Sequence, residues 1–217
     1  MKGVVKRLYN QFLRERLPRK VAVYNGVPVR NVRLLDQTDE FPAYEGPLLR
    51  GIRDQVAPGD DVVIVGGGLG VSSVVAAHQC GTSGSVVAFE GGRERAERAR
   101  ETLELNRVDD VVTIRHGIVG SNIDVQGTTG GATTVPVTDL PDCDVLVLDC
   151  EGAELDILED SVDARAIVVE THGFLDAPEP QVRDLIEARG YEVVDRGVEA
   201  EELGVYVLTA VVGDATV

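Results

Sequence analysis

Residues 61–70 read Asp-Val-Val-Ile-Val-Gly-Gly-Gly-Leu-Gly, and this stretch decides the fold class of the chain. The apolar run Val62–Val65 predicts a buried strand, the glycines after it predict a turn, and residues 71–79 predict a helix. Phe89-Glu90 closes the next apolar run. This layout is typical of a pocket for a nucleotide cofactor, because glycines let the backbone approach the ligand closely. A carboxylate at the end of the second strand then binds the hydroxyls of a ribose.

The spacing of the glycines separates two kinds of cofactor. Gly66, Gly68 and Gly70 follow the pattern G-x-G-x-G. A dinucleotide fingerprint instead requires glycine or alanine where this chain has Val71. Glycine turns after strands are common, so the loop alone is a weak signal, and Glu90 is what strengthens the prediction of a cofactor site. Glu90 has a structural alternative as a carboxylate at the start of the helix predicted for 92–105.

The chain is strongly acidic and nearly lacks lysine. Of 217 residues, 37 are acidic and 21 are basic, which gives a formal net charge of −16, and only three of the basic residues are lysines. An acidic, lysine-poor surface suits a cytoplasm filled with salt, because screening removes self-repulsion. We therefore expect a halophilic protein, with an ordinary acidic enzyme as the alternative. The same charge argues against nucleic acid as the main partner.

Length and apolar patterning favour one large domain in the cytoplasm. A chain of 217 residues can bury a central sheet on both faces. No apolar run approaches the roughly 20 residues that cross a bilayer, and the basic N-terminus lacks the apolar segment of a secretion signal. The cysteines lack the spacing of a metal site and are expected to be free thiols in a reducing compartment. They are Cys80, Cys143 and Cys150.

Strand and helix patterns alternate from Asp61 onward, which predicts an α/β fold with a mostly parallel sheet and helices on both faces. The last two apolar runs are only about ten residues apart, too close for a helical crossover, so the C-terminal strands are expected to be antiparallel. The expected strands are 61–65, 85–89, 111–115, 144–149, 165–170, 191–194 and 205–212, and the expected helices are 71–80, 92–105, 152–159 and 179–189.

Several N-terminal patterns precede this alternation. Apolar residues three and four apart predict a helix at 2–16. The cationic segment 2–20 is interpreted either as a solvated helix face or as a contact with membrane phosphates or an anionic acceptor. Residues 20–32 predict a hairpin around Asn25-Gly26, since Asn-Gly takes the positive φ angles of a tight turn. A polar segment at 36–46 and a helix at 47–56 follow, and residues 117–138 are interpreted as an insertion or hairpin at the pocket mouth.

A second group of charged residues follows the strand at 144–149, in the block Leu148-Asp149-Cys150-Glu151-Gly152-Ala153-Glu154. The strand delivers Asp149 to its carboxyl end, where ligands bind in open α/β sheets. Carboxylates clustered at the end of an apolar strand require a compensating ligand or proton, so Asp149 and Glu151 are candidate site residues. Glu154 and Asp156 are explained as acids that favour the start of a helix.

The next strand ends in Glu170-Thr171-His172 and is expected to lie beside the strand that ends at Asp149. His172 would then reach the same pocket as a catalytic or substrate-contacting group, although a lone histidine in a loop is more often a surface residue. His116 follows the third strand, where an adenine ring would rest.

Taken together, these motifs resemble the FkbM family of S-adenosylmethionine-dependent methyltransferases, over residues 45–212. The most specific element is the Asp-x-Glu-Gly-x-Glu block at 149–154. The resemblance implies a class I, Rossmann-like methyltransferase domain at 46–217, with a seven-stranded sheet and an antiparallel C-terminal strand. An accessory helix and hairpin at 1–45 would lie on the substrate side. The implied reaction is O-methylation of a sugar, a glycan or a small metabolite, at a hydroxyl or a carboxyl.

The resemblance also implies where the cofactor, S-adenosylmethionine, and its product, S-adenosylhomocysteine, would bind. The glycine loop would surround the methionine end, Glu90 would hold the ribose and the segment around His116 would line the adenine. The residues expected to contact the cofactor are Glu45, Gly66, Gly67, Gly68, Leu69, Gly70, Glu90, Gly91, His116, Gly117, Ile118 and Asp149.

The chain departs from the family pattern at three places. Ile64 stands where the family has an acidic residue, Gly67-Gly68 replaces Ala-Asn, and Gly91 stands where proline is common. The missing acid would otherwise bind the amino group of the methionine. Its loss therefore means weaker affinity, replacement by Glu45 or Asp149, or loss of activity.

Methyl transfer to oxygen requires the acceptor to be held in line with the methyl group and, for an alcohol, removal of a proton. Asp149, Glu151 or His172 is the expected base; a divalent ion held by the carboxylates is an option that the sequence does not predict. Two alternatives from other classes stay open: a non-catalytic Rossmann-like binding protein and a nicotinamide-dependent oxidoreductase. The partner is expected to be a small-molecule or glycan acceptor, and the sequence indicates no oligomeric state.

Overall fold

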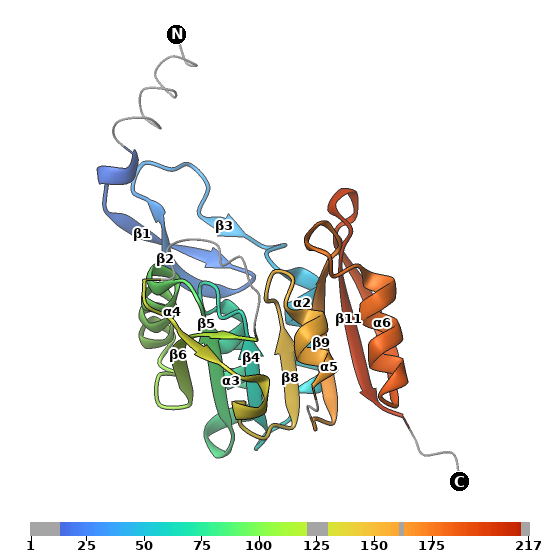
Figure 1. Cartoon of the computed structure of the whole chain (residues 1–217). Helices are drawn as coiled ribbons and strands as arrows, with labels where there is room; N and C mark the ends of the chain where they lie inside the picture. Colours follow the sequence, from blue (N-terminus) through green and yellow to red (C-terminus); the bar gives the residue numbers. More distant parts are fainter. Residues whose placement is uncertain (1–13, 121–129, 161–162, 214–217) are drawn as a thin grey trace.

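The computed structural model of the chain describes residues 14–120, 130–160 and 163–213 (Figure 1). Its main feature is a sheet of eight strands. These are β4 (Asp61–Val65), β5 (Ser85–Glu90), β6 (Val112–Val119), β7 (Thr133–Val135), β8 (Val145–Leu148), β9 (Ala166–His172), β10 (Tyr191–Ala200) and β11 (Val205–Val212). Their order across the sheet is β10-β11-β9-β8-β4-β5-β6-β7.

The sheet is parallel from β9 to β7. β11 is antiparallel to both of its neighbours, β9 and β10. The predicted mostly parallel sheet with an antiparallel C-terminal strand is therefore confirmed. The expected seven strands become eight because β7 forms within the segment interpreted as an insertion or hairpin. β7 runs parallel to β6, so these two strands do not form a hairpin.

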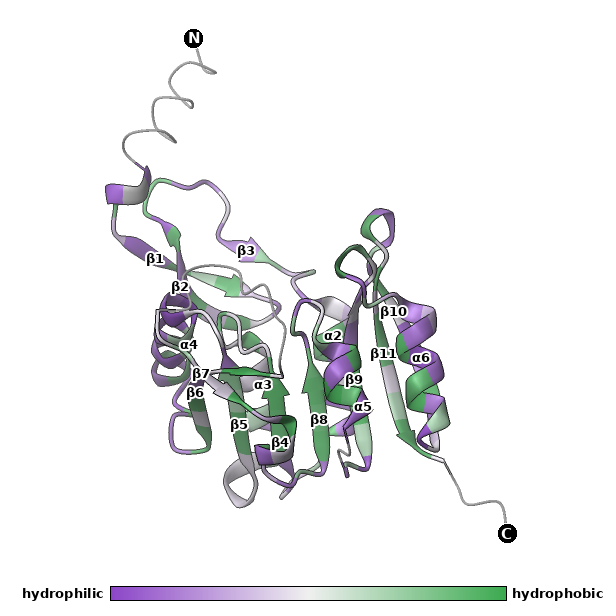
Figure 2. Cartoon of the chain, viewed as in Figure 1, coloured by the Kyte–Doolittle hydropathy of each residue, from purple (hydrophilic) through white to green (hydrophobic). Residues whose placement is uncertain are grey.

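Helices cover both faces of the sheet, as predicted. α2 (Gly46–Gln55), α3 (Val71–Cys80) and α4 (Arg93–Asn106) bury one face, and α5 (Glu154–Glu159) and α6 (Glu179–Ala188) bury the other. Along β4, Val62 and Ile64 join the first core whereas Val63 and Val65 join the second, because successive side chains point to opposite faces. Burial on both sides explains the continuous apolar run, and Figure 2 shows the central strands as hydrophobic.

A small sheet of order β2-β1-β3 precedes this domain. It consists of β1 (Arg19–Tyr24), β2 (Val27–Arg33) and β3 (Glu40–Phe41). The predicted hairpin is confirmed, since Asn25 and Gly26 have φ angles of 47° and 89° between the two paired strands. Buried residues of the hairpin, Ala22 and Val29 among them, belong to the same core as α3 and α4. Most of the helix predicted at 2–16 lies outside the described residues.

Two predicted strands extend at least four residues beyond their expected ends. The strand predicted at 111–115 continues to Val119, because its second half pairs with β7. The strand predicted at 191–194 continues through charged residues to Ala200, because β11 supplies its backbone partners while most of the added side chains are exposed. Among the described helices, none is long and apolar enough to cross a bilayer.

Candidate active site

The glycine loop joins β4 to α3 at the carboxyl end of the sheet and presents bare backbone there. Gly66 and Gly67 both donate an amide N–H to the carbonyl oxygen of Phe89, each at 2.9 Å. Gly66 has a φ of 98°, and a side chain at this position would collide with the carbonyl oxygen of Asp149, so only glycine fits. Gly68 also has a positive φ, and the space where its side chain would stand is open.

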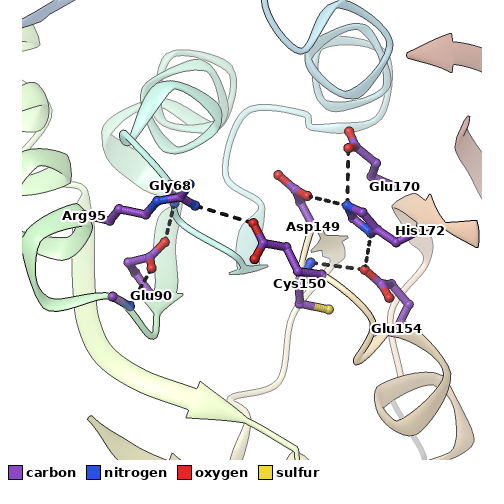
Figure 3. Close-up of polar contacts among 10 residues, drawn as sticks. Gly68, Glu90, Arg95, Asp149, Cys150, Glu154, Glu170 and His172 are labelled. Carbon is purple, nitrogen blue, oxygen red and sulfur yellow. Dashed lines mark hydrogen bonds and ion pairs between the residues drawn. The ribbon is translucent and has the colours of Figure 1, made fainter. Parts of the chain in front are cut away.

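Glu90 ends β5 with its carboxylate turned toward this loop (Figure 3). Its Oε2 accepts a hydrogen bond from the Gly68 amide and its Oε1 accepts one from the Gly92 amide, both at 2.7 Å. Only 5% of the residue is exposed. Burial raises the pKa of Glu90, although the two amides oppose this shift. Each oxygen keeps a second lone pair, so the carboxylate can still accept hydrogen bonds from ribose hydroxyls.

Two adjoining cavities open here, and Gly68, Arg95, Asp149 and Glu151 border both. The larger cavity has a volume of about 470 Å³. Other predicted cofactor residues line one cavity each. Those at the smaller cavity are Gly66, Glu90, Gly91, Gly117 and Ile118, and those at the larger cavity are Glu45 and Leu69.

Three predicted cofactor residues line neither cavity. Gly67 is held against β5 by its amide, and a side chain at Gly70 would lie 3.1 Å from the backbone of Ala99 in α4. These two glycines therefore shape the loop. His116 was expected beside adenine, but its Nε2 lies 3.2 Å from the carbonyl oxygen of Gly91. It supports the loop after β5 instead of lining a cavity.

Arg95 borders both cavities and was missed by sequence reasoning. It lies in the first turn of α4, and its Nη1 is 3.7 Å from Oε1 of Glu151. A cation in the first turn of a helix is unfavourable because it opposes the helix dipole. An arginine at this position, shortly after Glu90, therefore indicates a role in the site that the sequence could have revealed. Glu151 follows β8 with a φ of 53°, a left-handed value that non-glycine residues rarely adopt.

His172 ends β9, which lies beside β8 as predicted. Its Nδ1 is 2.7 Å from Oε1 of Glu154. Glu154 is fully buried, and its carboxylate also accepts hydrogen bonds from the amides of Cys150 at 3.3 Å and Gly152 at 2.9 Å. The interpretation of Glu154 as merely a helix-start acid is therefore corrected. The residue does begin α5, but its side chain turns inward and holds the imidazole.

The other imidazole nitrogen of His172, Nε2, faces two carboxylates (Figure 3). Oδ1 of Asp149 and Oε1 of Glu170 each lie 3.6 Å from it. Glu170 is only 8% exposed, and its Oε2 has no hydrogen-bond partner within the described part of the chain. Because Glu170 and His172 are two positions apart on a strand, they face the same side. That alternation could have added Glu170 to the predicted site.

The ionisable groups of this cluster are strongly perturbed. Burial raises the pKa of Asp149 to about 6 against the opposing effect of His172. Burial, with the charge of Asp149, raises the pKa of Glu170 to about 9. Burial disfavours the charged form of His172, but its hydrogen bond to Glu154 and the nearby carboxylates outweigh that effect and raise its pKa. Such a cluster favours a bound proton or cation.

Position 64 carries no acid, and an acidic residue, Glu45, borders the larger cavity from another element. Ile64 has an apolar side chain that is fully buried in the core, so it borders neither cavity. Glu45 borders the larger cavity from the N-terminal side, next to Tyr44. Burial and the charge of Asp149 raise the pKa of Glu45 to about 8.

An open, mostly parallel sheet ending in an antiparallel strand, with a glycine loop and a carboxylate on adjacent strands, defines the class of Rossmann-like methyltransferases. Residues 65–193, more than half of the chain, match the model of the FkbM methyltransferase domain. The chain belongs to the FkbM methyltransferase family. A comparison with curated protein sequences finds no significant match.

Solved structures share this fold at low sequence identity. A candidate transferase from Pyrococcus horikoshii has a TM-score of 0.57 at 18% identity, with 90% of this chain and 72% of that chain covered. A candidate tRNA (m1A22) methyltransferase from Streptococcus pneumoniae, in complex with S-adenosylmethionine, has 0.53 at 14%, covering 78% and 73%. An O-methyltransferase from Bacillus cereus, in complex with S-adenosylhomocysteine, has 0.50 at 17%, covering 76% and 78%.

These comparisons decide several predictions. S-adenosylmethionine as the cofactor of this family is confirmed, and the family match displaces the nicotinamide-dependent oxidoreductase. The fold does not support the expected exclusion of nucleic acid, because a candidate tRNA methyltransferase shares it. The acceptor, the site residues and the halophilic character stay predictions.

Proposed function

We propose that the chain transfers a methyl group from S-adenosylmethionine to a hydroxyl oxygen of a sugar, a glycan or a small metabolite. The observation that carries this proposal is the adjacency of two groups of residues. The glycine loop with Glu90 and the pair Asp149 and His172 border adjoining cavities. Open space above Gly68 and free lone pairs on Glu90 fit an adenosyl group. The bound cofactor supplies an electrophilic methyl group.

The cofactor would be held by residues of three elements. Glu90 accepts hydrogen bonds from the ribose, and Gly117 and Ile118 border the position of the adenine. Glu45 and Asp149 both border the larger cavity, so they are placed to replace the acid that is missing at position 64. Paired with the amino group of the methionine, they strengthen binding more than rate, since they act equally before and during transfer.

His172 is the favoured base for the acceptor hydroxyl. Glu154 fixes Nδ1, which leaves Nε2 facing the larger cavity. A proton taken up at Nε2 would be stabilised by the buried carboxylate of Glu154, as in other carboxylate–histidine pairs. Asp149, 3.6 Å from Nε2, is the second candidate. We assign Glu151 to the wall of the site, where Arg95 neutralises it.

The charge of the larger cavity favours a hydroxyl over a carboxyl acceptor. Burial and the charges of neighbouring acids already raise the pKa values of Glu45, Asp149 and Glu170, so the cavity disfavours one more negative charge and an acceptor carboxylate would bind poorly. The aromatic side chains of Tyr44 and Phe174 offer apolar surface for a sugar ring or another small acceptor. The acidic residues that line this cavity are Glu45, Asp149, Glu151, Glu170 and Glu199.

Two predictions from the sequence enter this proposal. Residues 1–45 act on the substrate side, which is supported by Asn31 and Tyr44 at the edge of the larger cavity. Leu203 and Phe174 form a C-terminal wall that the sequence did not reveal.

We also propose a cytoplasmic location, supported by three cysteines that are all free thiols.

Calorimetry with S-adenosylhomocysteine in molar KCl tests the cofactor assignment. The protein should bind it in the micromolar range, and Gly68→Arg should abolish binding because the new side chain occupies the cavity. Gly190→Arg is the matched control, since Gly190 also has a positive φ and open space but lies between α6 and β10. A flat titration with the unmodified protein would refute the assignment.

Release of S-adenosylhomocysteine in the presence of sugars and their carboxylate counterparts tests the acceptor. Methylation of the hydroxyl compounds alone is expected. Methylation restricted to the carboxylates would overturn the hydroxyl assignment, and cofactor binding without transfer to any compound would favour the non-catalytic binding protein.

A further inference from the structure

We infer that Asp149, Glu170 and His172 form a site for a divalent cation at the edge of the larger cavity. The mixed set of one imidazole nitrogen and two carboxylate oxygens suits a first-row transition metal such as Mn²⁺. Its role rests on the proposed function, because the cation would contact the acceptor hydroxyl beside the methyl donor.

The spacing of the three ligand atoms fits a shared central ion. All three lie within 4.8 Å of one another, and Nε2 of His172 is 3.6 Å from each carboxylate oxygen. A separation of 3.6 Å is too long for a hydrogen bond. It falls between the roughly 3.0 Å of adjacent ligands and the roughly 4.2 Å of opposite ligands that each lie about 2.1 Å from an octahedral ion.

The second observation is the buried oxygen of Glu170. Oε2 has no hydrogen-bond partner among the described residues, although 92% of this glutamate is removed from solvent. A buried carboxylate oxygen without a partner is costly, and a cation at the cluster would satisfy it. This observation is independent of the clustering of the ligands.

Glu154 is a hydrogen-bond acceptor for the second ring nitrogen of His172, and metal-binding histidines usually have such an acceptor. Its carboxylate, 2.7 Å from Nδ1 of His172, fixes the tautomer in which Nδ1 carries the proton and Nε2 offers a lone pair. Two backbone amides fix Glu154 in turn. The imidazole is therefore oriented toward the cluster before any ion arrives.

Three protein ligands leave coordination positions open for oxygens of the acceptor. A cation there lowers the pKa of a hydroxyl, so the O–H bond breaks with loss of the proton to water. The oxygen then forms a bond to the methyl carbon as the carbon–sulfur bond breaks, which yields the methyl ether and S-adenosylhomocysteine. Nε2 of His172 cannot bind the cation and act as base at the same moment, so the cation replaces that role.

Titration with Mn²⁺ tests the site, and electron paramagnetic resonance measures binding as the loss of the signal of free Mn²⁺. The experiment uses the full chain in molar KCl, which screens diffuse binding to the acidic surface. One saturable Mn²⁺ per chain is expected. Glu170→Gln should weaken it by at least about 10-fold. Glu199→Gln removes a carboxylate of the same cavity that lies outside the cluster, and it should change the affinity by less than about 3-fold.

Absence of a saturable ion, or equal weakening by the two variants, would overturn the proposal. If Glu170→Gln fails to fold, as judged by circular dichroism, Asp149→Asn replaces it with the same expectation. Titration with S-adenosylhomocysteine in the presence of a chelator is measured separately. Cofactor binding without Mn²⁺ binding would sink the cation site alone, and Mn²⁺ binding without cofactor binding would sink the proposed function alone.

Discussion

Glu154 Oε1 lies 2.7 Å from Nδ1 of His172 and thereby joins the first residue of α5 to the last residue of β9. The contact is fully shielded from solvent on the Glu154 side. Two backbone amides and the imidazole satisfy the carboxylate, so neither partner can rotate without leaving a buried charge unpaired. Nε2 of His172 is consequently held toward the larger cavity, whether it accepts a proton or binds a cation.

Glu154→Gln should lower kcat by about 10- to 100-fold, because the imidazole loses its charged partner and its fixed orientation. S-adenosylhomocysteine affinity should change by less than about 2-fold, since Glu154 lines neither cavity. Steady-state kinetics and calorimetry on the same preparation separate the two effects. Asp156→Asn, which changes another acid of the first turn of α5, should leave both quantities unchanged. A parallel loss of turnover and cofactor binding would indicate general disruption instead of a positioning role.

Glu90→Gln should weaken binding of S-adenosylhomocysteine by about 10- to 100-fold, because a charged hydrogen-bond acceptor is worth about 1.5–3 kcal/mol. The NH₂ group of the glutamine would also face the backbone N–H of Gly68 or Gly92, so two donors would meet and one hydrogen bond would be lost. Calorimetry measures the loss, and Glu94→Gln in the exposed first turn of α4 serves as the control. Equal affinities for Glu90→Gln and the unmodified protein would remove Glu90 from the ribose site.

The order of strands and helices could be predicted because apolar runs, glycines and turn residues are local signals. Val62–Val65 has no polar residue, and a strand buried on both faces requires such a run. β7 was missed because Thr133–Val135 is short and owes its strand conformation to pairing with β6. Such a long-range contact leaves no periodic trace in three residues.

The site was predictable where residues lie at the carboxyl ends of strands, as Asp149 and His172 do. Glu154 was misjudged because an acid in a first helical turn has a sufficient local explanation. Its contact with His172 depends on how α5 packs against the sheet. Arg95 and Glu170 each had a weak local signal, a cation in a first helical turn and a strand position on the face of His172, but the cavities that they border form only when distant elements pack together.

Stability should fall as pH rises through the titration of Glu45. Its pKa is raised from 4.5 to about 8 by burial, then by Asp149 and Glu199, against the hydrogen bond from Tyr44 and the charge of Arg95. The folded state therefore holds this proton more tightly than the unfolded state, and the associated stability is lost between pH of about 4.5 and about 8.

Glu45→Gln removes that titration, so its Tm relative to the unmodified protein should rise across the same pH range and level off above it. Thermal melts by circular dichroism measure the difference. Glu40→Gln alters an exposed acid of β3 and should give a difference that does not vary with pH. A pH-independent difference for Glu45→Gln as well would show that Glu45 ionises normally in the folded state.

The Tm of the protein should rise as KCl increases from low concentration to the molar range. With a net charge of −16, the folded chain repels itself when unscreened, and the Debye length shortens from about 10 Å at 0.1 M salt to about 3 Å at 1 M. Sorbitol at equal osmolality controls for stabilisation that does not depend on charge. If Tm is highest without salt, or if sorbitol reproduces the whole increase, the halophilic interpretation of the acidic surface is wrong.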